Sequence, residues 1–167
     1  MSSVARELSH LLHLEDLYKS YGDKLVLENI DLLVVNDEEL RQLAQVRNLK
    51  VAARAVLGMG PKRLIVKRGE FGALLFEAGD SFFVPAYPLE DEMDPTGAGD
   101  SFAGALLGYL AQKDSTDRTT LRQALHTGAT VASFCVEGVG TSRLSELEPS
   151  AIRTRMSELR ALVHPGD

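Results

Sequence analysis

The stretch DPTGAGDSFAGALLGYL, residues 94–110, combines a glycine-rich turn with the start of an apolar helix. Gly97 and Gly99 flank Ala98, and residues this small let a ligand approach the backbone closely. The first N–H groups of a helix lack partners within the helix and carry the positive end of its dipole. The segment therefore predicts an anion site made of backbone amides, which holds a phosphoryl group without a basic side chain.

Asp100 falls in the first turn of this predicted helix, beside the expected anion site. A carboxylate is a poor neighbour for an anion in a site that only binds. It becomes useful if it accepts the proton of a hydroxyl that attacks the bound phosphate. A glycine-rich turn followed by an acidic first turn is also a common purely structural arrangement, so Gly-Ala-Gly-Asp alone leaves both interpretations open.

Two other phosphate-binding motifs are excluded by inspection. The dinucleotide fingerprint G-x-G-x-x-G would require glycine at the position of Phe102. The P-loop requires Gly-Lys followed by Ser or Thr, and the chain contains no such triplet.

Apolar runs and helical spacing alternate along the chain. Strands are expected at residues 32–35, 63–67, 73–76 and 81–84, the last two forming a hairpin around Gly79-Asp80. Helices are expected at residues 4–18, after Asn36-Asp37, at 48–57, directly after the loop 94–99, and from about 120 and 149. The last helix should bury Ile152, Met156, Leu159 and Val163. This alternation predicts a three-layer, Rossmann-like α/β domain with a mainly parallel sheet.

Composition narrows the classes of partner. The chain has 167 residues, 44% of them hydrophobic, and a net charge of −6 without a basic block, which argues against a nucleic-acid ligand. No apolar run is long enough to span a membrane and the amino terminus lacks a signal-peptide pattern, so we expect a cytoplasmic protein. Cys135 is the only cysteine, which excludes an internal disulfide and favours a buried thiol.

The segment DPTGAGDSFAGALL resembles the second signature of the PfkB (ribokinase-like) carbohydrate kinases at every constrained position. Asn36-Asp37-Glu38-Glu39 is similar to the N-x-x-E motif of that family, although alone it also describes a capped helix start. Residues 67–72, KRGEFG, resemble the family's K-x-G-x-x-G. The three motifs occur in the family's order and spacing, and the resemblance runs from about Val26 to Leu159.

The resemblance implies an ATP-dependent kinase that phosphorylates a hydroxyl of a sugar or nucleoside. It implies that Asp100 is the catalytic base and that the amides of Gly97, Ala98 and Gly99 form the anion hole. Nucleotide contacts are implied for Lys67, Gly69, Gly72, Thr127, Gly138 and Gly140. Magnesium is implied at Asn36 and Glu39 through water, and a monovalent cation such as K⁺ at Asp94 and Thr96. The segment 134–142 is implied to complete the cation site and to border the adenine.

The sequence departs from the family at its amino-terminal side. Complete members carry there the sugar-binding residues, a di-glycine motif and a β-sheet lid, none of which is recognisable here. We therefore expect residues 1–25 to be a helical segment of unassigned role and residues 26–163 to be the carboxy-terminal nucleotide-binding and catalytic domain. A truncated, non-catalytic nucleotide-binding module is the alternative. A sheet lacking its other half would have an exposed edge, which a homo-oligomer or another partner chain would cover.

Overall fold

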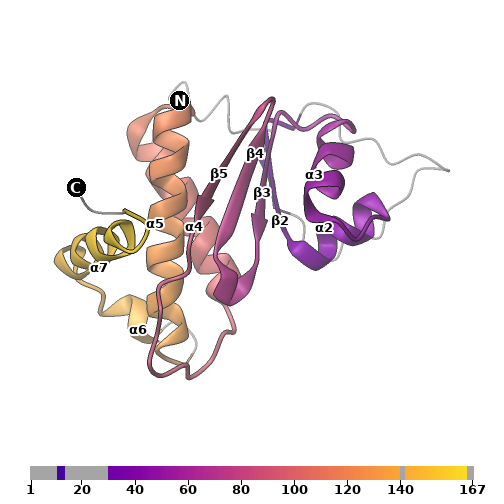
Figure 1. Ribbon diagram of the computed structural model, residues 1–167. Helices are drawn as coiled ribbons and strands as arrows, with labels where there is room; N and C mark the ends of the chain where they lie inside the picture. The colour runs from indigo at the N-terminus through magenta and orange to yellow at the C-terminus, as the bar shows by residue number, and fades with distance from the viewer. Residues whose placement is uncertain (1–10, 14–29, 140–141, 165–167) are drawn as a thin grey trace. The chain divides into compact units, whose positions relative to one another are not determined.

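The computed structural model describes residues 11–13, 30–139 and 142–164 (Figure 1). They form two compact units, the first from residues 11–13, 30–68 and 74–83 and the second from residues 69–73, 84–139 and 142–164. In the described part of the chain, no helix is both long and apolar enough to cross a membrane.

The first unit is built on a sheet with the strand order β1-β2-β3-β4-β5. The strands are β1 (Leu11–His13), β2 (Leu32–Asn36), β3 (Arg63–Lys67), β4 (Ala73–Glu77) and β5 (Asp80–Val84). Strand β2 pairs in parallel with both β1 and β3. The links at residues 68–72 and 78–79 are too short for a parallel crossover, so β3-β4 and β4-β5 are antiparallel. The sheet is therefore mixed, and the expectation of a mainly parallel sheet is wrong.

Strand β1 lies inside the stretch 4–18, whose apolar spacing predicted a helix. At Leu11–His13 that prediction is wrong, because these residues pair with residues 32–34 of β2. For these three residues, hydrogen bonding to a strand distant in the sequence outweighs the helical spacing of the apolar side chains around them. The rest of the predicted helical segment lies outside the described residues.

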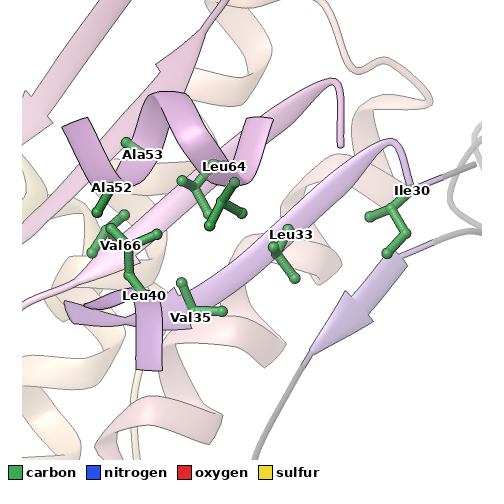
Figure 2. Packing of buried hydrophobic residues seen from close by; sticks show 9 residues of the cluster. Ile30, Leu33, Val35, Leu40, Ala52, Ala53, Leu64 and Val66 are labelled. Carbon is green, nitrogen blue, oxygen red and sulfur yellow. The ribbon is translucent and has the colours of Figure 1, made fainter. Parts of the chain in front are cut away.

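Helices α2 (Asp37–Ala44) and α3 (Leu49–Leu57) pack against β2 and β3. Every second residue of a strand points to the same face, which brings Leu33 and Val35 together with Leu64 and Val66. Figure 2 shows these side chains meeting those of the two helices. The buried cluster comprises Ile30, Leu33, Val35, Leu40, Ala52, Ala53, Val56, Leu64 and Val66. Truncating one of its leucines to alanine is expected to cost about 2–5 kcal/mol.

The second unit is mainly helical. It contains α4 (Ala98–Lys113), α5 (Arg118–Val136), α6 (Ser142–Ser145) and α7 (Pro149–Ala161). Helices α4 and α5 lie side by side, and they approach closely at Gly128, where a Cβ atom would stand 2.9 Å from the Phe102 carbonyl oxygen (Figure 1). Helix α7 begins at Pro149 and buries Leu159, as predicted. Ile152 and Met156 are only half-buried, and Val163 follows the end of the helix and is 53% exposed, so the predicted burial of these three residues is wrong.

Candidate functional site

Helix α4 begins without a side-chain cap. Its N-cap residue, Gly97, has a left-handed backbone with φ 83° and accepts the first intrahelical hydrogen bond, from Ser101 N at 2.9 Å. The Ser101 hydroxyl donates to the same carbonyl at 2.8 Å. A left-handed φ strains residues that have a Cβ, which explains why glycine stands at this position. No side chain therefore caps the N–H groups of the first turn.

The amide groups of this first turn differ in their partners. Ala98 N donates to the Pro95 carbonyl at 3.1 Å. Gly99 and Asp100 precede the first intrahelical bond, so their N–H groups have no acceptor within the helix. The Asp100 carboxylate is exposed on the same turn. One helical turn thus presents two backbone donors, the positive end of the helix dipole and a carboxylate.

The loop before α4 is tied to the end of α5. Met93 N and Asp94 N donate to the Val136 carbonyl at 3.0 and 3.3 Å, and the Cys135 thiol lies 3.7 Å from the Thr96 carbonyl oxygen. Cys135 is buried, as predicted. The structure thereby brings residues 94–96 beside the beginning of the segment 134–142, two regions that the resemblance assigned to one cation site.

Asp94 and Thr96 are also joined to each other. Thr96 N donates to Asp94 Oδ1 at 2.9 Å. A hydrogen bond from the Thr96 hydroxyl and, after it, the bond from the Thr96 amide hold the pKa of Asp94 below its usual range. Asp94 is therefore ionised at neutral pH, and its carboxylate can offer an oxygen ligand to a cation.

The N-x-x-E segment lies at the carboxyl end of β2 in the first unit. Asn36 Oδ1 accepts from Glu39 N, and Asn36 N donates to Glu39 Oε2, each at 2.7 Å, which makes a capping box. Asn36 is the register partner of Lys67, so both lie where β2 and β3 end. Ligands of α/β sheets bind outside the carboxyl ends of the strands. These three predicted site residues therefore share one edge of the sheet.

The capping box limits what Asn36 and Glu39 can offer a metal ion. Asn36 Oδ1 and Glu39 Oε2 are engaged with the helix start, whereas Glu39 Oε1 has no hydrogen-bond partner among the described residues. The same part of the chain contains no group of three or more His, Cys, Asp or Glu side chains that could hold a metal. A single carboxylate oxygen fits Mg²⁺, which usually keeps several waters and takes further ligands from substrate phosphates.

The glycines of the K-x-G-x-x-G segment are required for two different reasons. Gly69 has φ 54° and faces open space, because a Cβ there would meet no atom within 4 Å. Gly72 has φ 78°, and a Cβ there would lie 2.1 Å from the Val84 carbonyl oxygen. Close backbone packing is therefore sufficient to explain Gly72. At Gly69 no neighbouring atom blocks the approach of a ligand to the backbone.

Two of the residues expected to contact the nucleotide, Thr127 and Gly138, lie on α5 and just after it. The Thr127 hydroxyl donates to the Gln123 carbonyl of its own helix at 3.0 Å. Gly138 is buried, and a Cβ there would lie 2.9 Å from Cβ of Arg143. Gly140 lies outside the described residues.

Sequence reasoning missed the acceptors that shape the loop. The carbonyls of Pro95 and Val136 fix the amides of Ala98, Met93 and Asp94. Every residue carries a backbone carbonyl, so no residue type marks one that will accept a long-range hydrogen bond.

Comparison with known protein families identifies relatives of this chain. Residues 13–148 match the pfkB family carbohydrate kinases. The match starts and ends earlier than the resemblance seen in the sequence, which ran from about Val26 to Leu159. A deoxyribokinase of Salmonella typhi is 31% identical over 133 residues, which are 77% of this chain and 40% of that protein.

Two solved structures show the same partial overlap. Aminoimidazole riboside kinase from Salmonella enterica, complexed with aminoimidazole riboside and an ATP analog, superimposes with a TM-score of 0.67 at 29% identity. That match covers 77% of this chain and 43% of the kinase. A putative ribokinase II from E. coli in complex with ATP and Mg²⁺ gives a TM-score of 0.64 at 29% identity, over 77% of this chain and 40% of that protein.

The chain thus spans about 40% of the length of the curated deoxyribokinase that it matches. Over that part it has the ribokinase-like α/β fold of the solved relatives. The chain belongs to the pfkB family of carbohydrate kinases.

Proposed function

We propose that this chain is the nucleotide-binding and catalytic part of a kinase that transfers the γ-phosphate of ATP to a hydroxyl of a sugar or nucleoside. The observation that carries the proposal is the uncapped start of α4, where the N–H groups of Gly99 and Asp100 lack helical acceptors beside an exposed carboxylate. Relatives described as a deoxyribokinase and an aminoimidazole riboside kinase support the class of acceptor.

In this proposal the first turn of α4 performs the chemistry. The acceptor hydroxyl oxygen attacks the γ-phosphorus, a new O–P bond forms, and the bond from phosphorus to the β–γ bridging oxygen breaks, which releases ADP. Asp100 accepts the proton of the attacking hydroxyl. The amides of Gly99 and Asp100 stabilise the charge that develops on the transferred group, while the Ala98 amide keeps the turn in shape by its bond to Pro95.

The remaining proposed contacts follow the family resemblance. Asn36 and Glu39 hold Mg²⁺ through water, and the ion, when bound, neutralises phosphate charge. Asp94 and Thr96 hold a monovalent cation such as K⁺ with their oxygens. The nucleotide contacts are assigned to Lys67, Gly69, Gly72, Thr127, Gly138 and Gly140.

A second candidate, for the 167-residue chain taken by itself, is a nucleotide-binding module without catalysis. The matched region is 40–43% of the length of the compared kinases. Phosphoryl transfer depends heavily on positioning the acceptor hydroxyl. A chain that binds ATP without an acceptor site would show slow ATP hydrolysis only.

A coupled ADP-release assay with a panel of sugars and nucleosides separates the two candidates. It is run with the full gene product and with the 167-residue chain, and ATP binding is measured by calorimetry with Mg²⁺. The matched variants are Asp100→Asn and Asp114→Asn, since both acids are exposed and stand at opposite ends of α4. Acceptor-dependent ADP release that Asp100→Asn abolishes and Asp114→Asn retains supports the kinase. ATP binding without such release supports the module, and absence of ATP binding contradicts both.

A further inference from the structure

Arg155 of α7 makes an unusually complete set of contacts for an arginine on a surface helix. Its guanidinium donates to Glu137 Oε1 at 2.8 Å and to Ser133 Oγ at 3.1 Å. It also lies over two aromatic rings, with Cζ 3.5 Å from the centroid of Phe134 and 4.6 Å from that of Tyr87. Its side chain is only 14% exposed. Planar stacking combined with directed hydrogen bonds is specific to arginine, so lysine would not reproduce this arrangement.

The aromatic partner Tyr87 belongs to the segment between β5 and α4, which leads into the anion-binding turn. Its hydroxyl donates to Glu158 Oε2 of α7 at 2.8 Å. Six residues of this segment, all those from Tyr87 to Met93 except Glu92, border a cavity of about 600 Å³ that Arg155 and Glu137 also line. Because the cavity leaves this side of the segment without close packing, the segment depends on directed contacts. These are the contacts of Tyr87 with α7 and the hydrogen bonds of the Met93 and Asp94 amides to α5.

The other partner, Glu137, directly follows Val136, whose carbonyl accepts the N–H groups of Met93 and Asp94. Glu137 Oε2 is buried and has no partner in the described part of the chain, so Arg155 provides the carboxylate with its only ion pair there. Without Arg155, both oxygens of a largely buried carboxylate would be unsatisfied. The carboxylate would then move towards water and displace the end of α5.

We infer that Arg155 is a positioning residue for the anion-binding turn at residues 97–100. It fixes the end of α5 and the segment that carries Tyr87, and the loop before α4 is hydrogen-bonded to that end of α5. It thereby sets the direction of the N–H groups of Gly99 and Asp100 without touching the nucleotide. This inference rests on the proposed function, because it takes the aligned amides to bind phosphate.

The test compares Arg155→Met with Arg153→Met in the 167-residue chain. Arg153 is on the same helix and exposed, so it controls for loss of a positive charge. Amide hydrogen exchange at Met93 and Asp94 reports the loop directly, and titration with Mg²⁺–ATP reports the turn. We expect Arg155→Met to speed exchange at these two amides by about tenfold and to weaken ATP binding by about fivefold to tenfold. Arg155→Lys should lie between, and Arg153→Met should match the unmodified chain.

The outcomes distinguish this inference from the proposed function. Unchanged exchange at Met93 and Asp94 in Arg155→Met overturns the inference, as does faster exchange with unchanged ATP affinity. Equally faster exchange at Leu106, in the middle of α4, would indicate general destabilisation and also overturns it. If the unmodified chain binds no ATP, the proposed function fails and exchange alone decides whether Arg155 holds the loop. If Arg155→Met does not fold, Glu137→Gln replaces it with the same expected results.

Discussion

Helices α2 and α4 both begin at residues that the resemblance assigns to the site, yet they begin in opposite ways. Helix α2 is closed by its own side chains, because Asn36 and Glu39 satisfy each other's backbone amides at 2.7 Å. Helix α4 is opened by Gly97, which contributes no side-chain cap. One helix start is satisfied internally, and the other leaves donors for a ligand. Substitutions at α2 should therefore act mainly on stability, and substitutions at α4 mainly on nucleotide use.

The largest expected effect is that of Asp100→Asn at the open start. Asparagine keeps the shape of the side chain and removes the proton acceptor, so phosphotransfer should fall roughly 10²- to 10⁴-fold. ATP affinity should change little, because the backbone amides remain. Steady-state kinetics of an acceptor-active form, together with calorimetric ATP titration, measure both quantities. Turnover close to that of the unmodified protein would mean that the base is another residue.

Gly99→Val should act on binding. A β-branched side chain at Gly99 obstructs the close approach of a phosphoryl group, so ATP affinity should fall by about tenfold or more, which corresponds to about 1.4 kcal/mol. Gly104→Val is the matched control, because Gly104 is exposed on the same helix and a Cβ there meets no atom within 4 Å. Unchanged ATP affinity in folded Gly99→Val, measured beside its thermal stability, would assign Gly99 to the turn alone.

At the closed start, Asn36→Ala removes an N-cap and should lower the free energy of unfolding by about 0.5–2 kcal/mol. Asn48→Ala is the control, because Asn48 caps α3 in the same way, with Oδ1 accepting from Val51 N at 3.1 Å. Urea unfolding should show similar losses in both variants. Only Asn36→Ala should also weaken the magnesium dependence of ATP binding. Equal magnesium dependence in the two variants would reduce Asn36 to a capping residue.

A third helix start gives the smallest effect, which depends on pH. Asp117 caps α5 by accepting from Thr120 N at 2.9 Å. Hydrogen bonds, first from Ser115 and then from Thr120, lower the pKa of Asp117 from 3.8 to about 2. A lowered pKa in the folded state means that the stabilisation is complete above pH 3.8 and disappears as pH falls towards 2.

The stability deficit of Asp117→Ala should therefore be constant at neutral pH and shrink as pH falls from 3.8 towards 2. Urea unfolding of both proteins across this range measures it. A deficit that does not change with pH would show that the carboxylate charge contributes nothing to the cap.

Elements with strong local signals were predictable from the sequence. The apolar run RLIVK gave β3 with its observed bounds, Arg63–Lys67. Asn48 and Gly58 bracket α3, and Pro149 starts α7. In each case the residues that end the element act within a few positions of themselves. The same holds for the uncapped start of α4, where glycines next to an apolar helix are visible in the sequence.

Features that depend on distant partners were not predictable. Strand β1 exists through pairing with β2, so its three residues gave no usable strand signal. The mixed character of the sheet follows from where the hairpin β4-β5 joins β3, which periodicity does not encode. The contacts of Arg155 with Tyr87 and Glu137 join separate segments, and many arginines occur on helices without such partners. Val163 fits the apolar spacing of α7, but the helix ends before it.

The most direct test of the contrast between the two helix starts is a titration of the ¹⁵N-labelled chain with Mg²⁺–ATP, followed by the amide resonances. The account predicts the largest shifts at Gly99 and Asp100, smaller ones at Glu39, whose amide is already bonded to Asn36, and none at Val51, whose amide is bonded to Asn48. In Gly99→Val the shifts at the start of α4 should be lost. Unmoved resonances of Gly99 and Asp100 at ATP concentrations that saturate binding would contradict the account, because the nucleotide would then be held elsewhere.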